Sequence, residues 1–260
     1  MRRYGDYLIL TAISILAVWP FLVNPSLPQG TDAELHIYRL AELSRLVRAG
    51  EFYPRWSPNF YFGYGYPIFN YYAPLSYYVG LLFDFLPVVQ PVGATKAVFV
   101  LGLFLGGLGT FGFVRDLWGR EAGWVAAAVY LYAPYVQYID PHARGVLAET
   151  FSLGVWPMAL WAFGRLRRQP TRWNWVAAVA GMAAIILTHN LMAMVWAGVL
   201  AGWLLWEFVF NAKEQRRERR RRNLSPAPPR PRAPPPHRLP PRHRPRRLLL
   251  ASCGAGTQRH

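Results

Sequence analysis

Two residues near the start of the chain have the types and the spacing that acid–base chemistry requires. Asp32 and His36 lie four residues apart in the segment 30–39, so a helix would present both on one face while Glu34 points elsewhere. A carboxylate with these neighbours can act as a general base or hold a divalent metal ion. We predict a helix that begins with Thr31 or Asp32 as its N-cap, runs to about Ala49 and is closed by Gly50. The alternative to a chemical role is that Asp32 only caps this helix and that His36 is solvated.

A second polar segment, residues 140–149, brings four ionisable side chains to the start of an apolar run. Its guanidinium, Arg144, could bind a phosphate through two parallel hydrogen bonds, or it could pair internally with Asp140 or Glu149. His142 is a supporting candidate in the same segment. A third polar segment contains His189, which belongs either to the same site or to a polar junction between two helices.

Residues 52–78 are dense in aromatic side chains, and the prolines and glycines among them exclude one regular element. Such rings anchor a protein at the membrane–water interface, and their faces also make stacking platforms for sugars or lipid chains. The sequence Gly63-x-Gly65 indicates a turn and not a nucleotide-binding loop. The rings that could line a groove are Tyr53, Trp56, Tyr64, Tyr66, Tyr71 and Tyr72.

The net charge of +16 belongs to the tail and not to the apolar body. Residues 1–212 hold 14 of the 29 Lys and Arg and 11 of the 13 Asp and Glu, whereas residues 213–260 hold 15 and 2. We therefore expect no nucleic-acid partner for the body, and membrane lipids instead. The single cysteine, Cys253, excludes a disulfide framework within the chain.

The chain is predicted to be an all-α integral membrane protein with about six transmembrane helices. A helix of roughly 20 residues crosses the hydrocarbon core of a bilayer, and we expect such spans near residues 7–23, 97–114, 123–139, 151–163, 175–187 and 191–210. Arg2 and Arg3 precede the first span and no small-residue cleavage site follows, which indicates a retained signal-anchor. Gly102-x-x-x-Gly106, inside a span, indicates close helix packing.

Residues 72–89 decide the topology. We predict that they lie in the interface or re-enter, because all the arginine clusters of the body then face the cytoplasm, as the positive-inside rule requires, and Asp84 avoids the bilayer centre. The three polar segments then share the extracytoplasmic face, within residues 24–96, 140–149 and 188–190. The alternative has seven spans with the N-terminus outside, and it separates the first loop from the other two.

The order of these parts resembles the GT-C superfamily of membrane glycosyltransferases. It is most similar to a bacterial family of membrane proteins labelled "6-pyruvoyl-tetrahydropterin synthase-related". The resemblance rests on Thr-Asp-x-Glu-x-His-x-x-Arg, then Tyr-Pro-Arg-Trp-x-Pro, Gly-Tyr-Gly-Tyr-Pro-x-Phe and Tyr-Tyr-x-Pro-Leu-x-Tyr-Tyr, followed by Ala-Arg-Gly-x-x-x-Glu. It covers nearly the whole body, as a GT-C-like module over residues 1–212, and implies a multi-pass protein of the inner (plasma) membrane.

The GT-C resemblance implies transfer of a sugar from a polyprenyl-phosphate donor at the outer face. Asp32 would then be the base or the ligand of a metal such as Mg²⁺ or Mn²⁺, with Glu34 and His36 beside it. Arg144, with His189, would hold the donor phosphate, and the aromatic loop would line the groove. Two other functions stay open: a transporter or scaffold, and a metal-dependent hydrolase that uses the three histidines outside the tail.

Residues 213–260 form a basic tail rich in Pro and Arg that cannot build a core. One interpretation is a disordered cytoplasmic tail attracted to anionic lipids. The other is that a frameshift near Asn223 truncates the chain, which would make it an N-terminal fragment of a longer protein.

Overall fold

A computed structural model describes residues 2–224, and the surroundings of side chains from Gly5 to Val209. The chain divides by its contacts into two units, residues 1–209 and 210–260, and the fold described below is that of the first. The part of the predicted tail beyond Leu224 lies outside the described residues.

The described part of the chain is helical, apart from loops and one isolated bridge between Ser57 and Tyr66. Four helices precede the longest packed helix: α1 (Arg2–Val23), α2 (Ala33–Arg48), α3 (Ile68–Tyr71) and α4 (Leu75–Asp84), with a 3₁₀ turn, η1 (Tyr61–Gly63). The remaining elements are α5 (Pro91–Trp118), α6 (Arg120–Leu131), the π-helix η2 (Tyr135–Arg144), α7 (Leu147–Arg168), α8 (Arg172–Thr188) and α9 (Asn190–Leu224).

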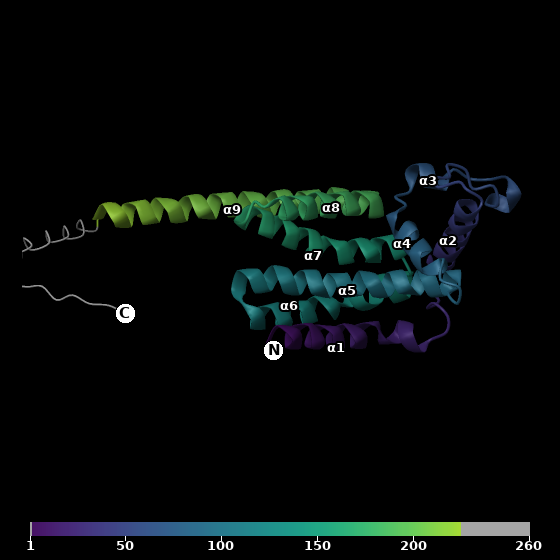
Figure 1. Cartoon of the computed structure of the whole chain (residues 1–260), viewed down its shortest axis with the longest axis horizontal. Coiled ribbons are helices and arrows are strands. Elements are labelled where there is room, and N and C mark those ends of the chain that lie inside the picture. The colour runs from purple at the N-terminus through teal and green to yellow at the C-terminus, as the bar shows by residue number, and fades with distance from the viewer. Residues whose placement is uncertain (1, 225–260) are drawn as a thin grey trace, which may run out of the picture. The chain divides into compact units, whose positions relative to one another are not determined.

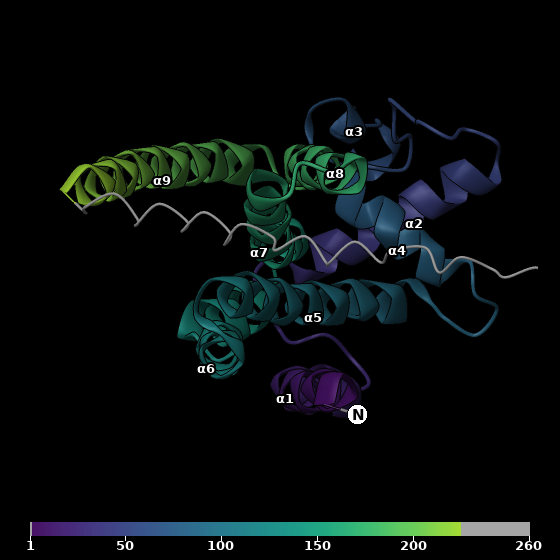
Figure 2. The same cartoon turned by 60° about the vertical axis from the view of Figure 1, so that its left-hand side comes forward.

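The long helices of the first unit lie lengthwise beside one another in layers. α5 packs against both α1 and α7, α6 packs beside α5, and α8 packs on the other side of α7. The short helices α2, α3 and α4 gather at one end of this bundle (Figures 1 and 2). The turns α5–α6 and α7–α8 lie at the opposite end, so each group of loops has its own end.

Three of the described helices are long and apolar enough to cross a bilayer: Gly5–Val23, Pro91–Trp118 and Asn190–Val209. They correspond to the first, second and sixth predicted spans, and α8 is apolar but shorter. α7 is 22 residues long, with arginines in its last turn. The prediction of an all-helical protein with apolar helices long enough to cross a membrane is therefore confirmed for these three helices.

The predicted span 123–139 is not one helix. α6 ends at Leu131, and the chain continues as the π-helix η2 after Pro134. A proline has no N–H to donate and its ring obstructs the preceding turn, so an α-helix seldom passes through it. Consequently Asp140 and Arg144, which we expected in a loop, are part of a helical segment.

Residues 72–89 contain only α4, a helix of 10 residues. Such a helix rises about 15 Å, half of the roughly 30 Å of a hydrocarbon core, and it packs on α2 at one end of the bundle. Asp84 is buried there, where Ser44 Oγ donates to it at 2.5 Å and Arg48 pairs with it at 3.4 Å. The prediction that this segment does not form a span agrees with the length of α4.

α5 and α7 approach closely because both contribute glycines to their contact. A Cβ at Gly154 would lie 2.0 Å from the carbonyl oxygen of Gly102, and one at Gly102 would lie 3.1 Å from the Cα of Phe151. Gly106 similarly faces Gly154 and the ring of Tyr130. The expectation that Gly102-x-x-x-Gly106 mediates close helix packing is confirmed.

We expect Gly154→Ala to lower the free energy of unfolding by about 1–3 kcal/mol, because the new methyl group would force two backbones apart. The measurement is the midpoint of thermal unfolding in detergent. Gly198→Ala in α9 is the matched control, since nothing lies within 4 Å of a Cβ there. Equal midpoints for the two variants would show that the α5–α7 contact is not tight.

Candidate functional site

α2 begins and ends where the sequence predicts. Asp32 occupies the N-cap position, Ala49 the C-cap, and Gly50 follows with a φ of +97° that favours glycine. The Asp32 carboxylate makes no capping hydrogen bond, and no hydrogen bond or ion pair engages it among the described residues. The capping interpretation of this side chain is therefore wrong, and its carboxylate is available to a ligand.

The segment before α2 is held directly against the end of η2. The Arg144 carbonyl oxygen accepts hydrogen bonds from the Asp32 N–H at 2.9 Å and from Thr31 Oγ1 at 3.0 Å. A Cβ at Gly30 would lie 2.8 Å from the Arg144 backbone, and one at Gly145, where φ is +70°, would lie 2.8 Å from Ala33. Two glycines thus permit the contact that brings the first two predicted segments together.

Asp140 and Arg144 form the centre of a polar network whose acids are buried. Asp140 is 0% exposed and accepts from Arg144 Nη1 at 2.9 Å and from Thr150 Oγ1 at 2.6 Å. Arg144 also pairs with Glu149 at 3.1 Å and donates to Tyr135, whose hydroxyl donates to Glu149. Arg144 therefore forms ion pairs with both of the acids that the sequence suggested as its internal partners, Asp140 and Glu149. All of these bonds use Nη1, and no bond of Nε or Nη2 occurs among the described residues.

His36 is buried, so the alternative in which its ring is solvated is wrong. It is 1% exposed, and its Nδ1 lies 2.7 Å from the hydroxyl of Tyr77. Its Nε2 has no hydrogen-bond partner in the described part of the chain. Burial lowers the pKa of His36 to about 3, helped by the charge of Arg39, so the ring is neutral at physiological pH.

Arg39 is a site residue that sequence reasoning missed. Its Nη1 donates to Tyr77 at 3.2 Å, its guanidinium lies 4.6 Å from the centre of the Tyr72 ring, and it has no acidic partner among the described residues. A half-buried guanidinium without a counter-ion favours a nearby anion. Its spacing could have identified it from the sequence. Arg39 follows Asp32 by seven residues and His36 by three, which places all three on one face of the helix.

The third predicted segment reaches this cluster through the tyrosines. Asn190 Nδ2 donates to the Tyr71 carbonyl at 2.9 Å, and the rings of Tyr72 and His189 are 6.4 Å apart. Burial lowers the pKa of His189, and the charge of Glu149 acts in the opposite direction. His189 therefore lies within electrostatic reach of the second segment.

The acids are also coupled to one another. Burial raises the pKa of Asp140 to about 7; the Thr150 hydrogen bond and the Arg144 charge oppose this, whereas the charges of Glu149 and Asp32 add to it. Asp32 similarly adds to the raised pKa of Tyr72, for which burial is the main cause. We refer to Asp32, His36, Arg39, Tyr72, Tyr77, Asp140, Arg144, Glu149 and His189 as the end cluster.

Several predicted residues do not join the end cluster. Glu34 is exposed on another face of α2. His142 stacks on Phe21 at 4.4 Å instead. Of the predicted aromatic groove, only Tyr72 contacts the cluster closely, and Tyr66 packs edge-on against Tyr71. The remaining rings, Tyr53, Trp56 and Tyr64, are exposed in the loop, with Trp56 lying beneath Gly65.

The described residues contain no group of three or more His, Cys, Asp or Glu side chains placed to hold a metal ion. The three histidines are dispersed, since His36 bonds Tyr77, His142 stacks on Phe21 and His189 faces Tyr72. A zinc site built from them has no support in this arrangement. The free Asp32 carboxylate could supply one ligand of a hard cation whose other ligands are phosphate oxygens.

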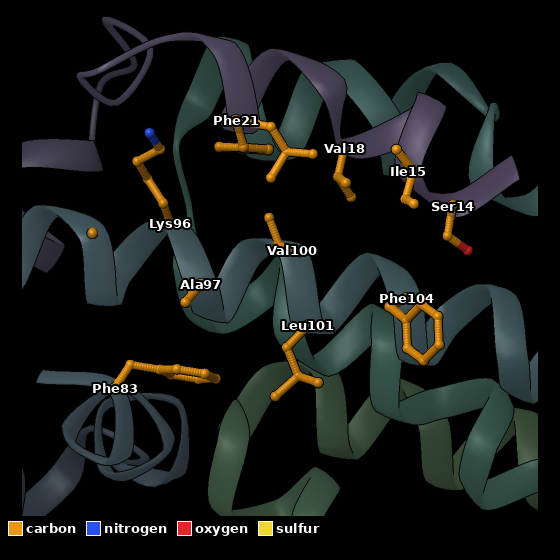
Figure 3. A pocket seen from close by; sticks show the side chains of 12 residues that line it. Ser14, Ile15, Val18, Phe21, Phe83, Lys96, Ala97, Val100, Leu101 and Phe104 are labelled. Carbon is orange, nitrogen blue, oxygen red and sulfur yellow. The ribbon is translucent and has the colours of Figure 1, made fainter. Parts of the chain in front are cut away.

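An apolar groove of about 540 Å³ lies between α1 and α5. Figure 3 shows Val18 and Phe21 of α1 facing Val100 of α5, with Lys96 at the end beside Phe21. Lys96 Nζ donates to the Asn24 carbonyl. Because Phe21 also stacks on His142, the groove reaches the same end of the bundle as the end cluster.

A polar cavity of about 470 Å³ lies on the other side of the last turn of α1. Asn24, Gln29, Gln137 and His142 are among the residues that line it. The Nε2 of His142 has no hydrogen-bond partner within the described residues. The cavity therefore offers amide and imidazole groups to a hydroxylated ligand.

We expect acid to destabilise the wild-type protein more than it destabilises the His36→Gln variant. Between about pH 6.5 and pH 3 the unfolded chain binds a proton at His36 that the folded chain does not, so stability falls as the pH falls through this window. From about pH 7 to pH 5 this contributes at most about 2 kcal/mol. The measurement is thermal unfolding in detergent at both pH values, and an equal loss in the two proteins would contradict the burial of a neutral ring.

Residues 69–219 match a family described as "6-pyruvoyl-tetrahydropterin synthase related domain; membrane protein". The match includes Asp140, Arg144, Glu149 and His189, and it begins after Asp32 and His36. No curated protein and no solved structure matches the chain. Because the match covers more than half of the chain, and three of its helices can cross a bilayer, the protein belongs to this family of membrane proteins.

Proposed function

We propose that this protein is a membrane glycosyltransferase of the GT-C type, which transfers a sugar from a polyprenyl-phosphate carrier to an acceptor hydroxyl on the extracytoplasmic side of the inner membrane. In this proposal the chain crosses the membrane several times, with the end cluster outside. The observation that carries the proposal is the hydrogen bond between the Asp32 N–H and the Arg144 carbonyl. It brings the segment with the unpaired Asp32 carboxylate, followed in α2 by Arg39, to the segment with Arg144, at the end of the bundle that the apolar groove reaches.

In the proposed reaction, Asp32 takes the proton of the acceptor hydroxyl as its oxygen attacks the anomeric carbon. The bond from that carbon to the phosphate oxygen breaks, and the polyprenyl phosphate leaves with the electron pair. Attack opposite the leaving group inverts the configuration. The acceptor needs a base near the sugar, and an unpaired carboxylate at an N-cap is accessible for this task.

Two guanidinium groups support the phosphate-binding part of the proposal. Arg39 has no acidic partner among the described residues, and Arg144 keeps Nε and Nη2 free of bonds there. Guanidinium groups bind phosphate through paired, charge-assisted hydrogen bonds. Asp140 and Glu149 orient Arg144, so we assign them a positioning role. A divalent cation, if the reaction uses one, would be held by Asp32 and the donor phosphate.

The lipid and sugar parts of the donor suit the two cavities. The groove between α1 and α5 is lined almost entirely by apolar side chains, as a polyprenyl chain requires. The polar cavity beside His142 has the amide groups that sugars bind. Both lie beside the last turns of α1, so one ligand could extend from the groove to the end cluster.

We expect Asp32→Asn to abolish sugar transfer, because an amide cannot accept the hydroxyl proton. Membranes containing the full chain would be incubated with radiolabelled polyprenyl-phosphate hexoses, and loss of label from the lipid would be measured. Glu51→Gln, an exposed acid outside the cluster, is the matched control and should keep wild-type transfer. Undiminished transfer by Asp32→Asn would remove Asp32 as the base, and uptake of sugar without cleavage from the lipid would favour a transporter.

The topology can be tested separately in intact cells. We expect a cysteine at Glu51 to react with a membrane-impermeant reagent, and a cysteine at Glu121, at the opposite end of the bundle, to react only after permeabilisation. Both residues are exposed, and Cys253 would be replaced by serine. The reverse pattern would place the end cluster on the cytoplasmic side and exclude the proposed reaction there.

A further inference from the structure

The end of the bundle opposite the end cluster collects three arginines from two helices, α5 and α7, around a single carboxylate. Asp116, near the C-terminus of α5, accepts from Arg165 at 2.9 Å and pairs with Arg115 at 3.0 Å and with Arg168 at 3.5 Å. Trp161 Nε1 also donates to it at 2.8 Å. One carboxylate cannot neutralise three guanidinium groups, so the group retains positive charge.

A fourth arginine extends the same group toward α1. Arg120 at the start of α6 pairs with Asp6 and lies 4.3 Å from the centre of the Trp124 ring. Four arginines therefore share two acids. Glu121 is exposed and makes no ion pair with them among the described residues. We refer to Arg115, Arg120, Arg165 and Arg168 as the arginine group.

Two cavities open onto the arginine group. One, of about 440 Å³, is lined by Asp6, Tyr7, Arg115, Arg120 and Arg165. The other, of about 380 Å³, is lined by Asp116, Arg165, Arg168, Gln169 and Asn174. Both have Arg165 in their lining, and each of the four arginines lines at least one of them.

We propose that the arginine group binds the phosphate of an anionic phospholipid headgroup. The excess positive charge requires an anion, and the guanidinium groups supply the paired N–H donors that phosphate oxygens accept. The group lies at the ends of two helices, α1 and α5, that can cross a bilayer, which is the depth of lipid headgroups. Basic pockets between transmembrane helices bind such headgroups. The proposal is independent of the reaction at the end cluster.

The test uses the full chain purified in detergent, with native mass spectrometry to count the lipids that it retains. We expect retention of phosphatidylglycerol in preference to phosphatidylcholine, and a loss of about tenfold in affinity for Arg120→Gln or Arg165→Gln. Arg172→Gln is the matched control: it removes the same charge at the same end, from a residue that lines neither cavity. It should retain the lipid as the wild type does.

Two variants keep the test decisive if one of them fails to fold, which thermal unfolding would reveal. Equal retention of the two lipids, or wild-type retention by both folded variants, would overturn the proposal. A loss of the same size in Arg172→Gln would also overturn it, because general surface charge would then explain binding. Displacement of the lipid by millimolar inorganic phosphate would assign the cavities to a soluble phosphate and not to a headgroup.

Discussion

The hydrogen bonds that the Arg144 carbonyl accepts from Thr31 and Asp32 determine the geometry of the end cluster. They join segments more than a hundred residues apart, and they form only because Gly30 and Gly145 have no Cβ to obstruct the approach. The start of α2 therefore has one position relative to η2. Through that position, α2 presents His36 and Arg39 to Tyr77 of α4, and η2 presents Arg144 at the same end of the bundle.

The two ends of the bundle differ in the burial and the net charge of their ionisable side chains. At the end cluster Asp140 and His36 are buried, and mainly for this reason the pKa of Asp140 is raised and that of His36 is lowered. At the arginine group the side chains are more exposed, and positive charge predominates. This separation accords with the positive-inside rule, which distributes basic residues to one side of a membrane. The two proposed anion sites therefore lie at opposite ends of the bundle.

Local features of the fold were predictable from the sequence, whereas long-range contacts were not. The extent of α2 followed from its capping position and Gly50, and the failure of residues 72–89 to form a span followed from Asp84 and the arginine distribution. The same distribution predicted that Asp32 and Arg144 lie on one side of the membrane, but it did not predict the long-range hydrogen bond between the Asp32 N–H and the Arg144 carbonyl. The burial of His36 was missed because it depends on Tyr77, 41 residues later, and such a contact leaves no periodic signal. The break at Pro134 was missed because hydropathy alone does not register a change of helix type.

The groove between α1 and α5 lies along two helices that are long and apolar enough to cross a bilayer. A hydrophobic ligand would enter it sideways, by diffusion within the plane of the membrane. Occupancy would then depend on how many carrier molecules share each unit of membrane area, and not on a concentration in water. A lipid that entered in this way would stay within the surrounding hydrocarbon, and so would avoid the large free-energy cost of exposing a long apolar chain to water.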